Sequence, residues 1–178
     1  MEGRREGLLR VLYLTIFLTS TGFGTATFLL PVFAQGLGAS YIDLGLIGAV
    51  GNAVYTAMTL ISGLLLDRYE RVRFYMAFAV LGSLVVLLFS ATSRVWEVVV
   101  VRGLMAVVSA AFWVAASTLT ADISPPQAMT RSMGRYNLSW IVGFIVGPSL
   151  GGAISGRYGF PALFSFLSVL VYLSAIVV

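Results

Sequence analysis

The residues of this sequence best suited to chemistry are charged side chains at the ends of apolar runs. One cluster holds Asp67, Arg68, Arg71 and Arg73, and Asp122 follows a later apolar run. Carboxylates and guanidinium groups in such places can pair with one another or with the end of a neighbouring helix. The alternatives are a solvated charge run and an ordinary interfacial helix end.

A further arginine, Arg102, lies inside an apolar run, six residues after Trp96 and hence roughly 9 Å along a helix. An arginine in lipid costs about 2.5 kcal/mol or more, so it should face protein or water. Residues at helical spacing share its face, and we expect this stripe to line a polar cavity. The alternative is that Arg102 reaches the outer headgroups. The candidate cavity or coupling residues are Arg102, Ser109 and Trp113, with Asn52 and Tyr55 from the preceding apolar run.

Several kinds of chemistry lack the residues they need. The sequence contains no cysteine and no histidine, and it shows no cluster of metal-ligand spacing and no phosphate-cradling loop on a strand. We therefore expect no catalytic site, no metal and no cofactor, and we do not expect an enzyme. The pI of about 9.8 could suggest nucleic acid, but all eleven basic residues are arginines that lie mainly in short loops. Membrane topology explains them better.

The elements that must position these residues are membrane-spanning helices. Of the 178 residues, 59% are hydrophobic and only 10% are charged, far below the roughly 25% of soluble domains. Six apolar runs cover residues 8–33, 44–66, 74–90, 96–119, 136–154 and 161–178. Each is near the length that crosses a bilayer, and backbone groups in lipid must be satisfied within a helix. We predict an all-α membrane protein with one six-helix domain, residues 1–178.

The arginines predict the orientation of these helices. With the first residues in the cytoplasm, the outer turns hold two arginines, Arg94 and Arg157, and the inner segments hold eight. The inner ones are Arg4, Arg5, Arg10, Arg68, Arg71, Arg73, Arg131 and Arg135. This bias predicts that both termini are cytoplasmic. The last run is still apolar at Val178, so we expect a fragment, one product of a split gene or a truncated form.

The segment 136–154 carries glycines at a regular spacing. Gly143, Gly147 and Gly151 recur every four residues, and Gly152 follows. They form one face without side chains, against which another helix can pack closely. Pro148 removes a helix hydrogen bond and should bend the helix. The alternative is a generic packing or dimerisation face.

Three of these motifs resemble signatures of the major facilitator superfamily. The turn that starts at Gly63 and continues through Asp67-Arg68 to Arg73 resembles the family's loop between helices 2 and 3, although Glu70 stands where the family usually has glycine. Arg102-Gly103 resembles, with shorter spacing, the arginine and glycine of helix 4. The run Gly143 to Gly152 closely resembles the helix 5 signature, especially that of proton-driven antiporters. The resemblance implies the amino-terminal half of a transporter, built from two inverted three-helix repeats.

The resemblance also implies a function. It indicates a secondary active transporter that moves a small solute across the cell membrane by alternating access, and the helix 5 motif favours proton-coupled efflux of drug-like molecules. The implied gating motif at the cytoplasmic side consists of Gly63, Asp67, Arg68, Arg71, Arg73 and Asp122. In similar transporters an acidic residue at the end of helix 4 pairs with these arginines, so the resemblance implies that Asp122 lies within ion-pair reach of Arg71 or Arg73. The implied partners are the lipid bilayer, a small-molecule substrate, protons, and a carboxy-terminal half or a second copy of the chain. The alternative is a membrane protein that binds or assembles partners without transport.

Overall fold

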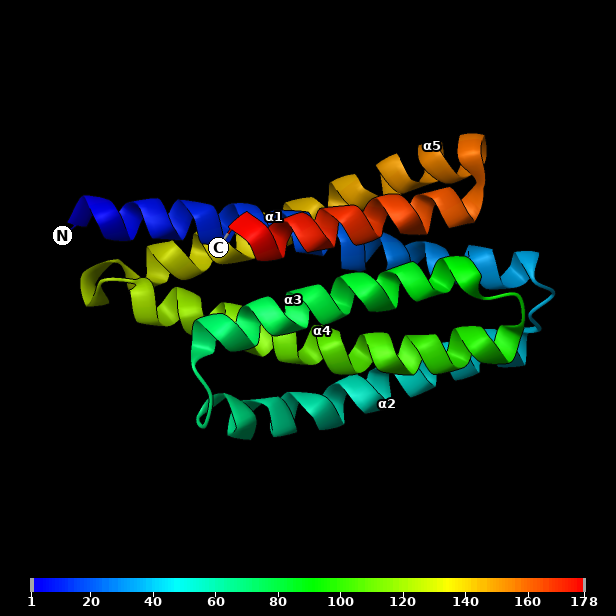
Figure 1. The fold of residues 1–178 in the computed structure, drawn as a ribbon, viewed down its shortest axis with the longest axis horizontal. Helices are drawn as coiled ribbons and strands as arrows, with labels where there is room; N and C mark the ends of the chain where they lie inside the picture. Colours follow the sequence, from blue (N-terminus) through cyan, green and yellow to red (C-terminus); the bar gives the residue numbers. More distant parts are fainter. Residues whose placement is uncertain (1, 178) are drawn as a thin grey trace.

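The computed structural model describes residues 2–177, and its long elements in that range are all α-helices (Figure 1). The helices are α1 (Glu2–Gly36), α2 (Tyr41–Leu66), α3 (Arg71–Leu88), α4 (Val95–Ile123) and α5 (Met129–Val177), with 3₁₀ turns η1 (Phe89–Ala91) and η2 (Pro126–Ala128). All five long helices in the described range are long and apolar enough to cross a membrane. Met1 and Val178, the limits of the predicted domain, and the side chain of Arg4 lie outside the described residues.

The last helix turns back on itself. A straight helix with the 49 residues of α5 would be about 74 Å long, more than twice the roughly 30 Å apolar thickness of a bilayer. The backbone instead leaves helical geometry at Gly159 (φ 83°, ψ 169°), and the chain reverses there (Figure 1). Glycine takes these angles without a Cβ clash. The predicted runs 136–154 and 161–178 therefore lie on the two sides of this reversal.

Side-chain caps set the starts of two helices. Ser40 and Asp43 form a reciprocal capping box, in which the Ser40 backbone N–H donates to the Asp43 carboxylate at 2.8 Å. The Glu97 carboxylate accepts from the backbone N–H groups of Ser93 at 2.7 Å and Arg94 at 3.1 Å. Such bonds satisfy amides that the helix cannot. They start α2 and α4 slightly before the apolar runs that the sequence marks.

The helices pack as a bundle around α1 and α4. α1 lies against α5, α2 against α4, and α3 against α4 and α5. Phe112 of α4 is fully buried at the centre, where its ring contacts Phe23 of α1 and Tyr75 of α3 at centroid distances of 5.9 and 4.7 Å. The Tyr75 hydroxyl lies 2.8 Å from that of Thr15, so this buried polar group has a partner.

One helix is left largely uncovered. In the most apolar stretch of α2 only 11% of the residues are buried, against 56% in α4. Figure 1 shows α2 at the edge of the bundle, with α4 on one side of it. The uncovered face of α2 is therefore free to contact lipid or another part of a larger protein.

Candidate functional site

An ion pair joins α3 to α4 at one end of the bundle. The Arg71 guanidinium pairs with the Asp122 carboxylate, and their side chains are 39% and 44% exposed. The prediction that Asp122 lies within reach of Arg71 or Arg73 is thus confirmed, with Arg71 as the partner. Arg73 instead pairs with Glu70, three residues earlier in the sequence, at 2.6 Å.

Other members of the predicted gating motif make fewer contacts. Asp67 caps the end of α2 through its backbone, and neither it nor Arg68 forms a salt bridge with another described residue. A Cβ added at Gly63 would meet nothing within 4 Å in the described chain. No other helix of this bundle therefore packs closely on Gly63.

Arg102 reaches from α4 across to α2. Its guanidinium covers Gly51, where an added Cβ would lie only 2.5 Å from the Arg102 Cζ and 2.6 Å from its Nε. The missing side chain of Gly51 thus makes room for a half-buried cation between two helices. Arg102 forms no ion pair with the residues that the structure describes.

The structure separates the stripe expected to run along α4 with Arg102. Ser109 is buried and donates its hydroxyl to the Ala106 carbonyl at 3.3 Å, so its polar group is used within its own helix. Trp113, one turn further, opens onto a recess that neither Arg102 nor Ser109 lines. Asn52 is exposed on α2 and does not line this recess either.

This aromatic recess lies between α2, α4 and the first part of α5 and has a volume of about 320 Å³. Its lining residues are Tyr55, Trp113, Tyr136, Asn137, Trp140 and Phe144. The Trp140 indole donates to the Asn137 side-chain oxygen at 3.0 Å, and the Trp140 and Phe144 rings meet edge to face at 5.6 Å. Aromatic walls with a few polar groups are typical of sites for organic molecules.

Sequence reasoning proposed Tyr55 and Trp113 for a cavity but missed Tyr136 and Phe144. A signal was available, because Tyr136, Trp140 and Phe144 recur every four residues and so share one face of a helix. That face adjoins the glycine face.

The glycine face of α5 packs directly on α1. A Cβ at Gly143 would overlap the Ser20 hydroxyl and lie 2.8 Å from the Phe17 carbonyl oxygen. One at Gly147 would lie 2.8 Å from the Thr21 carbonyl oxygen, and one at Gly151 would overlap the Thr25 methyl group. These glycines therefore let two backbones approach more closely than any side chain allows. We call this contact the glycine seam.

The remaining residues of the helix 5 motif behave differently. Nothing lies within 4 Å of a Cβ added at Gly152, so that glycine is outside the seam. α5 keeps helical angles through Pro148, and within the described chain its one non-helical position is Gly159. The hydroxyls of α1 at the seam are satisfied by their own helix, with Thr21 donating to Phe17 O at 2.8 Å and Thr25 to Thr21 O at 2.6 Å.

Comparison with known proteins decides the family. The sequence model of the Major Facilitator Superfamily matches residues 12–178. The chain belongs to the Major Facilitator Superfamily. It is thus an integral, multi-pass membrane protein of a family of transporters. The resemblance seen in its motifs is confirmed.

Individual superfamily members resemble the chain over part of their own length. An uncharacterised transporter of this type from Methanocaldococcus jannaschii is 29% identical over 98% of the chain and 45% of that relative. The quinolone resistance protein NorA of Staphylococcus aureus is 29% identical over 94% of the chain and 44% of NorA. The multidrug resistance protein MdtG of Proteus mirabilis is 24% identical over 95% and 43%. The chain spans less than half the length of these relatives.

Solved superfamily structures share the fold. A bacterial homologue of the human lysosomal transporter Spinster, in an inward-facing conformation, superposes with a TM-score of 0.81 at 17% identity, over 97% of this chain and 42% of that one. A peptide transporter in complex with sulfate gives a TM-score of 0.75 at 19% identity, over 95% and 36%. The bundle therefore has the architecture of one part of a longer superfamily transporter.

Proposed function

We propose that this chain is the amino-terminal half of a secondary active transporter in the cell membrane, which moves a small solute by alternating access. The observation that carries the proposal is the aromatic recess, which is lined in part by the largely uncovered helix α2. A recess of this kind can form one wall of a substrate cavity, and a second bundle would supply the other wall. The proposed substrate is a drug-like organic molecule, because the recess offers indole and phenyl faces with one amide.

The proposed topology has six spans with both termini in the cytoplasm. The reversal at Gly159 supports two spans within α5, and the arginine bias supports the orientation. Two inverted three-helix repeats, α1 to α3 and α4 to the end of α5, would then surround the recess.

Proton-coupled efflux is the proposed form of transport. NorA and MdtG are named for resistance to quinolones and to multiple drugs, and the glycine seam matches the antiporter-like signature of the sequence. The acidic residues of this chain near the spans, Asp43, Asp67, Glu97 and Asp122, all lie near helix ends. The proposed proton carrier therefore lies in the second bundle.

Each motif then has a proposed role. The glycine seam keeps α1 and α5 together as one rigid unit during rocking. The Arg71–Asp122 pair holds the cytoplasmic end of the bundle, and Gly63 leaves room there for the second bundle to close. That second bundle is a carboxy-terminal half or a second copy of this chain, and native mass spectrometry in detergent distinguishes the two.

The test is export of a fluorescent cationic dye from cells that produce the protein. We expect dye accumulation to fall relative to cells without it and to recover when an uncoupler removes the proton gradient. Replacement of Trp140 by Ala should abolish most of this export, because it removes the central wall of the recess. The matched control is Trp96→Ala, at a tryptophan that is 60% exposed and outside the recess.

Two outcomes would contradict the proposal. If no solute from a panel of cationic, anionic and neutral organic compounds moves faster in producing cells, the chain does not serve transport. If Trp96→Ala and Trp140→Ala reduce export equally, the recess is not the substrate wall.

A further inference from the structure

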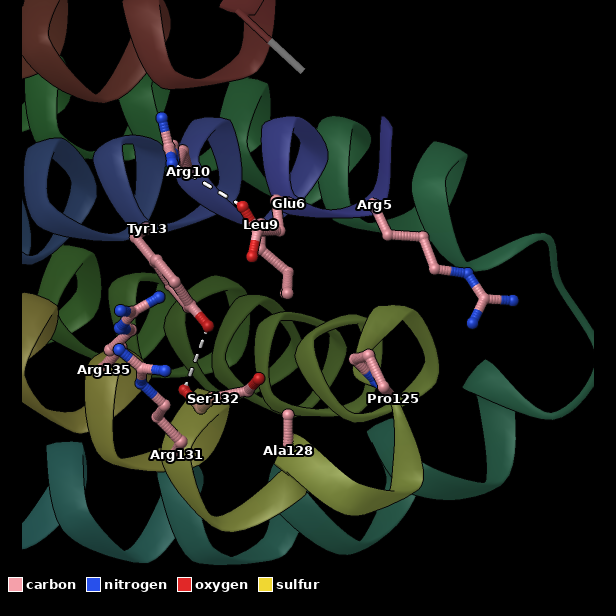
Figure 2. A pocket seen from close by; sticks show the side chains of 10 residues that line it. All are labelled: Arg5, Glu6, Leu9, Arg10, Tyr13, Pro125, Ala128, Arg131, Ser132 and Arg135. Carbon is pink, nitrogen blue, oxygen red and sulfur yellow. Dashed lines mark hydrogen bonds and ion pairs between the residues drawn. The ribbon is translucent and has the colours of Figure 1, made fainter. Parts of the chain in front are cut away.

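A second pocket lies at the end of the bundle where α1 begins and α5 begins. Figure 2 shows it between the first turns of α1 and the α4–α5 connection, with a volume of about 210 Å³. Its lining residues are Arg5, Glu6, Leu9, Arg10, Tyr13, Pro125, Ala128, Arg131, Ser132 and Arg135. We call it the basic pocket. It is separate from the aromatic recess, with which it shares no residue.

The charge of the basic pocket is strongly one-sided. The lining contains four arginines and one carboxylate, that of Glu6, which gives it a formal charge of +3. Glu6 pairs with Arg10 at 3.7 Å, and Figure 2 shows this pair on the α1 side. Arg5, Arg131 and Arg135 form no ion pair with any residue that the structure describes. Like charges gathered around one hollow repel, so an anion is the ligand that fits there.

All four arginines are exposed, and Figure 2 shows Arg10 directed away from Arg131 and Arg135. Arg131 and Arg135 are four residues apart on α5 and therefore project from one face, and Figure 2 shows them side by side near Tyr13. The Tyr13 hydroxyl donates to the buried Ser132 carbonyl at 3.2 Å, which fixes α1 against the start of α5. Buried Leu9 forms an apolar part of the wall.

We propose that the basic pocket binds a phosphate-bearing anion, with two or more guanidinium groups on its oxygens. Guanidinium groups match phosphate in a bidentate manner and keep their charge at every physiological pH. The pocket lies where α1 and α5 leave the membrane on the arginine-rich side, which is where anionic phospholipid headgroups gather. Bound phosphate would link α1 to α5 at one end, as the glycine seam does along their length. Phosphate binding at this pocket does not require transport.

The experiment is native mass spectrometry of the purified protein in a neutral detergent, titrated with phosphatidylglycerol or with phosphatidylcholine. We expect phosphatidylglycerol to be retained preferentially, and the double variant Arg131→Gln with Arg135→Gln to weaken its binding about tenfold or more. The matched control is Arg68→Gln with Arg73→Gln, which removes two charges from the same end of the bundle outside the pocket. Circular dichroism checks that all three proteins have the same helix content.

Competition separates the two sources of phosphate. If millimolar inorganic phosphate fails to displace phosphatidylglycerol, the ligand is the lipid headgroup. If inorganic phosphate itself binds and the pocket variant loses that binding, the ligand is a free phosphate compound, and the pocket is still a phosphate site. Equal losses in the pocket and control variants, or no preference for either phosphate probe over phosphatidylcholine, would overturn the proposal.

Discussion

Residues of one type have different environments along α5, and the glycines show this most clearly. Gly143 and Gly147 face backbone atoms of α1 at 2.8 Å from an added Cβ, whereas Gly152 faces open space. Backbone atoms of a packed helix cannot move aside as the end of a flexible side chain can. The same substitution should therefore have opposite effects at neighbouring positions of one motif.

Replacement of Gly143 by Ala should destabilise the protein by about 1–3 kcal/mol, the usual cost of overpacking. The β-carbon would collide with Ser20 and with the backbone of α1. Gly152→Ala is the control and should be neutral or slightly stabilising, because alanine favours a helix by about 1 kcal/mol over glycine. The measurement is the midpoint of thermal unfolding in detergent. Equal midpoints for the two variants would show that the seam is not closely packed.

The sequence pattern could identify the glycine face, but it could not identify contacts between residues of different helices. The spacing of Gly143, Gly147 and Gly151 alone predicts a smooth helical face. The position of Arg102 over Gly51 depends on how α2 and α4 pack against each other. The residue pattern of one helix alone cannot predict that packing. Spacing on α4 predicted one stripe through Arg102, Ser109 and Trp113, but the neighbouring helices bury one of these and separate the other two.

At the scale of elements, turns and end contacts decide how the helices are joined. Gly159 reverses α5 with a positive φ, and the Arg71–Asp122 pair fastens the start of α3 to the end of α4. The two apolar runs 136–154 and 161–178 predicted a turn between them, and the family resemblance predicted the ion pair. The sequence could not mark the helix starts, because the capping groups of Ser40, Ser93 and Arg94 precede the apolar runs.

Gly159→Ala should destabilise the reversal by about 1–3 kcal/mol, because a residue with a Cβ is strained at these backbone angles. Gly156→Ala, in the same helix but with a Cβ in open space, is the control and should have little effect. Hydrogen exchange at the end of α5 would measure the difference. Similar exchange in the two variants would mean that α5 does not depend on glycine for its reversal.

Charge reversal tests the Arg71–Asp122 ion pair between α3 and α4. Arg71→Asp should reduce dye export several-fold with little change in stability, because a half-exposed pair is screened by water. The double variant Arg71→Asp with Asp122→Arg should restore export, since it rebuilds the pair in the opposite sense. The control is the same swap at Glu70 and Arg73, which lie within one turn and join no two helices. If dye export does not recover in the double variant, the pairing of residues 71 and 122 is not what export requires.

At the scale of the whole molecule, the chain forms a bundle with one helix largely uncovered and an aromatic recess on that side. The proposed second bundle would lie opposite this recess. The arginine bias makes a separate prediction about orientation. A reporter that is active only in the cytoplasm should function after residue 69, in the α2–α3 turn, and fail after residue 92, in the turn before α4. The reverse result would invert the topology.

Alternating exposure of the aromatic recess is the central claim, and accessibility labelling tests it most directly. The chain contains no cysteine, so a single Asn137→Cys substitution in a cysteine-free protein reports on the recess alone, and Phe166→Cys, outside it, serves as control. With a membrane-impermeant maleimide, we predict labelling of position 137 from the outside under one condition and from the inside under another, switched by substrate or a proton gradient. Labelling from one side under every condition, or none from either side, would contradict the account.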